Sequence, residues 1–465
     1  MIIRGITRLK ERWNAPFGYK EILKLALPLI ITTGSWSITQ FIDRVFLTWY
    51  SPEAIAAAMP SGMLNFTMVC VFIGTINYVT VFVAQYFGSK NYKMIGAVMW
   101  QGLYLALFGA LILLPFIPAA GTIFNFIGHE PEVRELQIVY FQIMTVGAFT
   151  VLCSCSLSSF FSGIGKPYIV MWTNVGMLVF NVIANYILIF GRFGFPEMGI
   201  KGAAISSVIS SVLNFAVYFA IIFKKDYRLK YNSLSAWRFN PKLIYRLLKF
   251  GLPNGFQFLL DMIGMTIFIF LVGRMGTSSL AATNIAFNIG NFSFMPMIGL
   301  GIAVSILVGR SIGAKNIKNA EFCTYSGFQM TGLYMLTIAL LFVFVPKIFI
   351  MPFAANVDMA DYQDMFTQAA ILLRFVAFYC LFDTMNIIFA SAIKGAGDTR
   401  FVVLVLGLAT VLFMIIPSYF AFFVFKLSLL GVWVIPTLYV VVLGIIFWLR
   451  FRNGAWKRMS VIEGS

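Results

Sequence analysis

Acidic side chains are scarce in this chain and almost absent from its long apolar segments. The 465 residues include 17 Asp and Glu. Charged residues make up 11% of the chain, whereas a soluble domain carries roughly 25%. Only Asp43, Asp261 and Asp383 lie inside long apolar runs. A carboxylate at bilayer depth costs about 2.5–3.5 kcal/mol on insertion scales, so acids kept there usually face a cavity and mark an ion or proton path. This composition excludes a soluble globular enzyme.

Residues that bind transition metals are equally rare. The chain has one His, His129, and five Cys, none of which forms a C-x-x-C pair. Zinc sites need several His, Cys or acidic ligands at short spacings, so zinc chemistry is excluded. The cysteines all fall within apolar runs, where they are best interpreted as small packing residues. We expect no cofactor.

Apolar side chains, by contrast, are abundant: 60% of the residues are hydrophobic, and the mean hydropathy is +0.89. A helix crosses the hydrocarbon core in about 20 residues, whereas a transmembrane strand needs only about 9–11. The runs are too long for strands and predict an all-α polytopic membrane protein. We expect twelve spans, at about 24–48, 54–85, 95–118, 136–160, 168–191, 200–223, 245–273, 280–310, 322–350, 367–391, 401–424 and 427–450.

The positions of the basic residues indicate how the chain is oriented in the membrane rather than nucleic-acid binding. The net charge is +17, but most Lys and Arg fall in alternate loops and in both tails. This is the positive-inside pattern, and it predicts that both termini are cytoplasmic. We expect membrane lipids as partners, no nucleic acid, and a monomer.

The chain repeats itself at an offset of about 225 positions. Lys24–Pro28 corresponds to Lys249–Pro253, and Gly88–Lys93 corresponds to Gly313–Lys318. Several ordered matches at one spacing indicate duplication, as in secondary transporters built from parallel repeats. The expected organisation is a basic cytoplasmic N-terminal segment (1–23), an N-lobe of six spans (24–223), a cytoplasmic linker (224–244), a C-lobe of six spans (245–450) and a cytoplasmic tail (451–465).

The second half carries two of the three acids that lie inside apolar runs. Asp261 follows Pro253 by about two helical turns, and Tyr379 precedes Asp383 by one turn on the same helix face. If these spans pack together, Asp261, Asp383 and Tyr379 could form an all-oxygen site for Na⁺, or the carboxylate pair could hold a proton. The alternative is structural pairing with buried cations, which the scarcity of Lys and Arg deep in the spans disfavours.

The first half has a smaller polar set. Gln40 precedes Asp43 by three residues, and Asn181 and Asn185 lie four apart in the fifth span, so each pair shares a face. Together they could line a polar pocket. For the asparagines, interhelical hydrogen bonding is an equally good interpretation.

One motif suggests chemistry of another kind. Gly395-Ala396-Gly397-Asp398 has the G-x-G-D pattern of intramembrane aspartyl proteases, but it follows the tenth span, and Lys394 and Arg400 flank it. A turn at the inner surface is the better interpretation.

Several stretches resemble the multidrug and toxic compound extrusion (MATE) family, in particular its NorM-like bacterial branch. The resemblance covers about residues 20–450, and the matching residues are Gln40–Asp43, Asn181 with Asn185, Gly251–Pro253 with Asp261, Ala281–Asn284 with Asn288 and Pro296, and Tyr379 with Asp383, Lys394, Gly395 and Asp398. Two departures stand out. Asp261 replaces the family's Glu, and Arg44 follows Asp43 where a small or neutral residue is usual.

The resemblance implies twelve helices in two six-helix lobes that form a V, in a bacterial inner (plasma) membrane, and export of cationic amphipathic compounds in exchange for Na⁺ or H⁺. It assigns Asp261, Asp383 and Tyr379 to a C-lobe cation site, which would be the Na⁺ site if Na⁺ is the ion. Asp43, Gln40, Asn181 and Asn185 would form an N-lobe site, and Asn284 and Asn288 would be further cavity candidates.

The rival interpretation is a lipid or lipid-linked oligosaccharide flippase of a related fold, whose cavity should carry Lys or Arg. A membrane protease that uses Asp261 and Asp383 is a weaker rival, and we expect no enzyme activity.

Overall fold

The computed structural model describes residues 11–353 and 359–462, and every regular element in these ranges is helical. Twelve of the described helical segments are long and apolar enough to cross a membrane. The all-α, twelve-span fold expected from the sequence is therefore confirmed. Much of the expected basic N-terminal segment and the last three residues of the tail lie outside the described residues.

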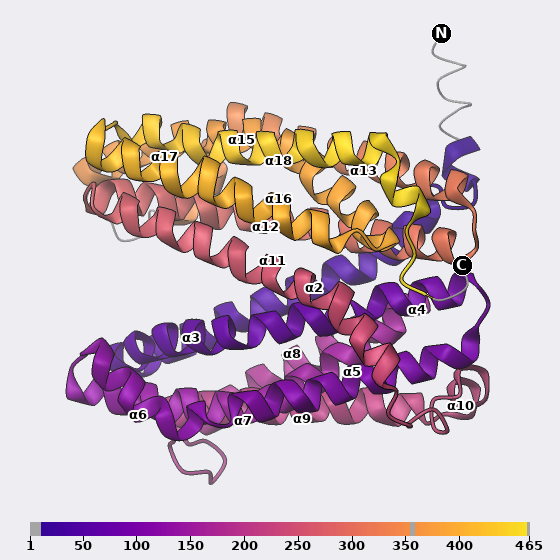
Figure 1. The fold of residues 1–465 in the computed structure, drawn as a ribbon. Helices are drawn as coiled ribbons and strands as arrows, with labels where there is room; N and C mark the ends of the chain where they lie inside the picture. Colours follow the sequence, from indigo (N-terminus) through magenta and orange to yellow (C-terminus); the bar gives the residue numbers. More distant parts are fainter. Residues whose placement is uncertain (1–10, 354–358, 463–465) are drawn as a thin grey trace. The chain divides into compact units, whose positions relative to one another are not determined.

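The helices follow one another along the chain as labelled in Figure 1. The elements are α2 (Tyr19–Tyr50), α3 (Pro52–Asn77), α4 (Val79–Gly88), α5 (Tyr92–Leu113), α6 (Phe116–Ile127), α7 (Pro131–Gly163), α8 (Pro167–Phe190), α9 (Ile200–Ile222), α10 (Lys225–Tyr231), α11 (Pro241–Gly273), α12 (Thr277–Gly313), α13 (Ile317–Phe344), α14 (Pro346–Ile350), η1 (Met351–Phe353), α15 (Met359–Ala396), α16 (Thr399–Ala409), η2 (Thr410–Ile415), α17 (Ile416–Tyr419), η3 (Phe420–Val424), α18 (Leu429–Asn453) and η4 (Ala455–Arg458).

The chain divides into two compact units. Among the described residues, the N unit comprises Ile31–Phe256 with Val461 and Ile462, and the C unit comprises residues 11–30 together with those of 257–460. The divisions fall inside α2 and α11, a few residues after Pro28 and Pro253. Proline lacks a backbone N–H and weakens a helix locally, so each of these helices contributes one segment to each unit.

In the N unit, α7 is the central helix and packs against α3, α5 and α9. Its core is rich in aromatic rings, including the fully buried Phe82, Phe160 and Phe161. The segment between the expected lobes is part of this packing, because α10 turns two tyrosines inward. The rings of Tyr227 and Tyr231 lie 6.3 and 5.6 Å from that of Phe160, which holds the segment against the N unit.

In the C unit, α15 is the central helix and packs against α12, α13 and α18 (Figure 1). Trp433 on α18 is fully buried at the centre of this core. It stacks on Phe287 of α12, with the ring centroids 4.9 Å apart, and its indole N–H donates to the Thr283 hydroxyl at 3.2 Å. The aromatic stack and the satisfied N–H fix the register between α12 and α18.

The internal repeat of the sequence recurs in the backbone. Lys90 and Lys315, at matching positions of the two halves, both adopt left-handed conformations, with φ of 61° and 57°. Gly165 and Gly397, at the later matching turn, also have positive φ, of 77° and 120°. Equivalent turns therefore end equivalent helices in both halves, as expected of a duplicated chain.

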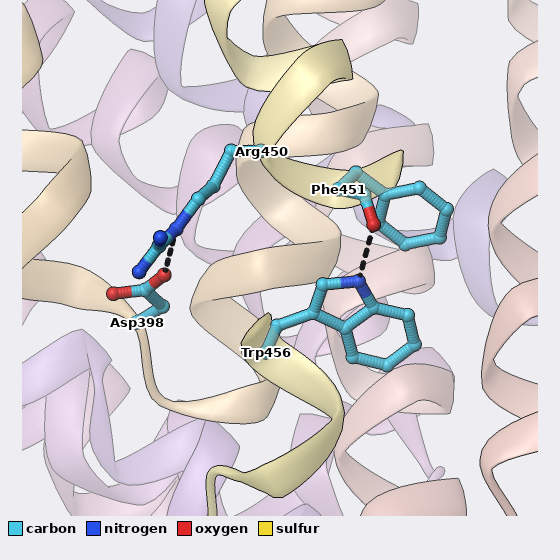
Figure 2. A network of polar contacts seen from close by, with 4 residues as sticks. All are labelled: Asp398, Arg450, Phe451 and Trp456. Atoms are coloured by element: carbon cyan, nitrogen blue, oxygen red, sulfur yellow. Dashed lines mark hydrogen bonds and ion pairs between the residues drawn. The ribbon is translucent and has the colours of Figure 1, made fainter. Parts of the chain in front are cut away.

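The G-x-G-D motif forms the turn predicted from the sequence. Gly397 ends α15, and Asp398 precedes the first turn of α16. As Figure 2 shows, the Asp398 carboxylate accepts from Nε of Arg450 at 2.9 Å, while the indole of Trp456 donates to the carbonyl of Phe451 at 2.8 Å. The motif is thus a charged brace between α16 and the end of α18.

One of the span boundaries that the sequence analysis misplaced bears on the site. The tenth span was expected to end near residue 391, which would place Lys394 beyond the helix at the surface. Instead, α15 continues to Ala396, and Lys394 lies in its last turn with a half-buried side chain. The left-handed Gly397, rather than the charge at position 394, ends the helix.

Candidate functional site

A cavity of about 140 Å³ lies within the C unit, among α11, α12, α15, η2 and α18. Two of its lining residues are acids, and most of the others are aromatic or sulfur-containing. The lining residues are Asp261, Gly264, Met265, Phe287, Phe294, Tyr379, Asp383, Met414, Pro436, Tyr439 and Val440. A mostly apolar pocket with a few convergent polar groups is the usual form of a binding site, and this volume suits an ion, because pockets for drug-sized molecules measure about 300–1,000 Å³.

The structure brings Asp261, Asp383 and Tyr379 together in this cavity. Asp261 projects from α11, whereas Tyr379 and Asp383 lie one turn apart on α15. Asp383 is 8% exposed, and its Oδ1 accepts a hydrogen bond from Asn386 at 2.7 Å. Asp261 is the more accessible of the two acids. The Tyr439 hydroxyl, 3.2 Å from the Thr410 hydroxyl, supplies another oxygen at the cavity wall.

A basic residue accompanies the acids, although the scarcity of Lys and Arg deep in the spans led us to disfavour a buried cation beside them. The Lys394 ammonium donates to Oε1 of Gln257 on α11 at 3.1 Å. Gln257 also forms a side-chain hydrogen bond with Asp261, one turn further along α11, and Lys394 and Asp261 lie within electrostatic reach of each other. The expectation failed because the helical extension of α15 carries the lysine stem over α11.

The polar residues predicted for the first half form a hydrogen-bonded group in the N unit. Nδ2 of Asn185 donates to Oδ1 of Asp43 at 2.5 Å and to Oδ1 of Asn181 at 3.0 Å. Oδ1 of Asn185 accepts from the Ser206 hydroxyl, and Asn181 donates to the Ser210 hydroxyl at 3.3 Å. Asn185 is fully buried and uses both ends of its amide, so it links α2, α8 and α9.

Three other predicted residues lie apart from these groups. Gln40 is exposed on α2, and the hydrogen bonds described for the Asp43 group do not include it. Asn284 and Asn288 are exposed on α12, and Nδ2 of Asn288 donates to the carbonyl of Asn284 at 2.8 Å. Neither asparagine lines the cavity that holds Asp261 and Asp383.

Sequence reasoning missed Ser206, Ser210 and Gln257. Ser206 and Ser210 are spaced four apart on α9, as Asn181 and Asn185 are on α8, so matched polar pairs in neighbouring spans were a usable signal. Gln257 precedes Asp261 by four residues and therefore shares its face of α11. Lys394 and its partner Gln257 are 137 positions apart in the sequence. Helical periodicity relates only residues a few positions apart, so this contact follows only from the packing of α15 against α11.

The donor set of the C-unit cavity suits a monovalent cation or a proton. It consists of two carboxylates and two phenol hydroxyls, which are hard oxygen ligands. Among the described residues, no group of three or more His, Cys, Asp or Glu side chains could hold a metal ion. The rings and thioethers around the acids provide an apolar wall that an organic cation could contact.

Twelve apolar helices, a repeated half and acids within the spans define the chain as a polytopic membrane protein of the transporter class. The comparison with known families makes this specific. The MatE family model matches residues 28–187 and 253–420, so both halves of the repeat are recognised. The chain belongs to this family of membrane transporters, as its sequence motifs predicted.

Similar proteins agree with this assignment, and solved structures share the fold. "Probable multidrug resistance protein NorM" of Thermotoga maritima is 24% identical over 445 residues, which are 95% of this chain and 94% of the relative. "Multidrug resistance protein NorM" of Aliivibrio fischeri is 25% identical over 439 residues, 94% of this chain and 89% of the relative. A solved outward-facing multidrug resistance MATE transporter of the MOP superfamily has a TM-score of 0.84 at 20% identity and covers 95% of this chain and 97% of its own. A MOP superfamily transporter from Pyrococcus furiosus, whose binding pocket is described as having reverse polarity, gives 0.83 at 20% identity, with the same shares covered.

Proposed function

We propose that this protein is a secondary active antiporter that exports cationic amphipathic compounds in exchange for Na⁺ or H⁺. The observation that carries the proposal is the pair Asp261 and Asp383, placed with Tyr379 in one cavity whose remaining wall is aromatic and thioether-rich. We further propose that the protein works as a monomer in a bacterial inner membrane, with both termini in the cytoplasm.

The exchange follows from charge balance at carboxylates that lie within the apolar spans. A coupling cation neutralises the carboxylates, and its loss leaves negative charge among apolar side chains, which is costly in a medium of low dielectric constant. The charged and neutralised forms therefore favour different arrangements of the surrounding helices. A ligand can drive the conformational change only through different affinities for the two states, and the acid pair provides such a difference.

The nature of the lining supports an organic cation as the exported compound. Phe287, Phe294 and Tyr439 line the cavity with aromatic rings, a residue type that attracts cations, and Met265 and Met414 adapt to varied apolar shapes. The relatives named NorM are multidrug resistance proteins, which agrees with a broad substrate range. The residues that line this cavity include two acids and no Lys or Arg, which favours cationic compounds over the anionic headgroup of a flippase substrate.

The N-unit group would act as a second polar site. Asp43 is held by Asn185 and accompanied by Asn181, Ser206 and Ser210, so a cation that reached it would meet prearranged oxygens. We propose that this group binds substrate or a coupling cation, as the resemblance implied for Asp43, Asn181 and Asn185.

The test is efflux of ethidium, a fluorescent organic cation, from proteoliposomes under separately imposed Na⁺ and pH gradients. We expect one gradient to drive dye movement and Asp383→Asn to reduce the rate to that of empty liposomes. The matched control is Asp226→Asn, which removes an exposed acid outside the spans and should leave the rate unchanged. Gradient-driven efflux that persists in Asp383→Asn would remove this cavity from the mechanism, and no efflux under either gradient would refute antiport of organic cations.

A further inference from the structure

Lys394 is the charged residue that the proposed exchange leaves unused. It lies in the last turn of α15, about three turns from Asp383, and its side chain turns toward α11 rather than outward. The ammonium donates to the Gln257 carbonyl oxygen, and the same amide forms a hydrogen bond with Asp261. Gln257 thus bridges a cation on one helix and an acid on another, all within the C unit.

We propose that Lys394 is a tethered counter-cation of the Asp261–Asp383 site, which competes with the coupling cation for the negative charge of Asp261 and thereby sets the affinity for that cation. The inference rests on the proposed antiport function and identifies a residue that tunes it. Lys394 does not line the cavity, so it acts through Asp261 and Gln257 as a positioning residue.

The chemistry of lysine suits this role. Its ammonium is a compact monovalent charge on a flexible four-carbon stem with rotatable donors, so it can approach a carboxylate or withdraw from it without breaking the helix. When no coupling cation is bound, it offsets part of the charge of Asp261. When a cation binds, the two like charges repel, and Gln257 gives the ammonium a place to remain hydrogen-bonded.

The titratable neighbours of Asp261 show how positive and negative charges are balanced around its carboxylate. Asp383 and Lys394 from α15 and Tyr439 from α18 all interact electrostatically with Asp261. Tyr379 of α15 lies beside Asp383 in the cavity wall, and both tyrosines are neutral donors when protonated. Among these neighbours, Lys394 supplies the positive charge, so its removal changes the net charge of the site by one unit.

The effect on cation binding should be large. At an effective dielectric constant of about 20, two unit charges a few Å apart interact strongly enough to change an equilibrium constant by tenfold or more. Loss of the ammonium should therefore tighten binding of Na⁺, or of a proton, by at least about tenfold. A lysine that only braces α15 against α11 would alter stability without this change in affinity.

The experiment measures cation binding by the full-length protein in detergent. Trp433 is a natural reporter, because it stacks on Phe287, which lines the cavity. The fluorescence of the nine tryptophans is followed during titration with NaCl, with choline chloride balancing the ionic strength, and separately with acid in Na⁺-free buffer, and Trp433→Phe identifies the part that Trp433 contributes. Lys394→Gln removes the charge, Lys394→Arg keeps it, and Asp261→Asn identifies the part of the signal that belongs to this site.

We expect Lys394→Gln to lower the half-saturating concentration of the responding cation at least tenfold, and Lys394→Arg to stay close to the unsubstituted protein. If Lys394→Gln folds poorly, the rise in melting temperature with NaCl or acid reports the same affinity, because binding to the folded state stabilises it. An unchanged or higher half-saturating concentration would overturn the inference. If Asp383→Asn still abolishes gradient-driven efflux in that case, the antiport function stands. If the unsubstituted protein responds to neither cation, both the role of Lys394 and the antiport function are refuted.

Discussion

The brace between Asp398 and Arg450 provides a sharp test of how the C unit is held together. The side chain of Asp398 is 6% exposed and that of Arg450 is 24% exposed. Replacing Arg450 by Met leaves a nearly buried carboxylate without its cation and also removes a guanidinium that lies 4.3 Å from the centre of the Phe401 ring. Breaking a buried pair costs about 3–5 kcal/mol, and since water reaches the arginine, we expect about 2–4 kcal/mol here.

The partner substitution should cost less. Asp398→Asn keeps an oxygen that can accept from Arg450, so we expect a loss of about 1–2 kcal/mol. The double variant carries no unpaired charge and should be more stable than the sum of the single effects predicts, by about 1–2 kcal/mol. The measurement is unfolding of the purified protein by SDS titration in mixed micelles, followed by tryptophan fluorescence.

The C unit also contains its own control pair. Lys457 forms an ion pair with Glu321, but their side chains are 36% and 37% exposed. Lys457→Met should therefore change the free energy of unfolding by at most about 1 kcal/mol. Equal losses for Arg450→Met and Lys457→Met, or additive effects in the Asp398–Arg450 cycle, would show that burial does not govern the strength of these pairs.

Two further predictions concern the helix that carries Asp261. Asp261→Glu should retain more ethidium efflux than Asp261→Ala, because it keeps a carboxylate at the cost of one extra methylene, and equal losses would mean that shape rather than charge matters there. Gly255→Ala should destabilise the N unit by about 1–3 kcal/mol, because the added Cβ would lie 2.2 Å from the Val71 carbonyl oxygen. The control is Gly121→Ala, because no atom lies within 4 Å of the added Cβ, and this change should stabilise the protein by up to about 1 kcal/mol. If thermal unfolding shows that both variants gain stability, or that both lose it, the packing argument is refuted.

The predictable part of this protein follows from local rules. Span length and hydropathy predicted twelve helices, and recurring short motifs near Pro28 and Pro253 predicted two related halves. The spacing of Tyr379 and Asp383 placed both on one face of a helix, and the structure finds both in the same cavity wall. Hydrophobic length, helical periodicity and internal repetition all operate over short sequence distances, so they can be read without coordinates.

Other features depended on tertiary packing. Asp261 and Asp383 are separated by most of the second half, and only the arrangement of α11, α15 and α18 brings both to one cavity. The place of Lys394 was missed because a boundary error of a few residues decides whether a lysine lies at the surface or against a neighbouring helix. Asn284 and Asn288 are the opposite case. The family resemblance made them candidates for the cavity, but both are exposed and neither lines it.

By itself, the sequence determined that the chain spans a membrane, that the described part has twelve apolar spans, and which polar residues lie within them, because insertion into hydrocarbon is governed by residue composition over short stretches. Only the tertiary structure decided which of those polar residues meet. Asn185 joins Asp43 to Ser206, and Gln257 joins Lys394 to Asp261, through contacts between helices far apart in the chain. Such contacts depend on side-chain packing across several elements at once, which no local pattern encodes.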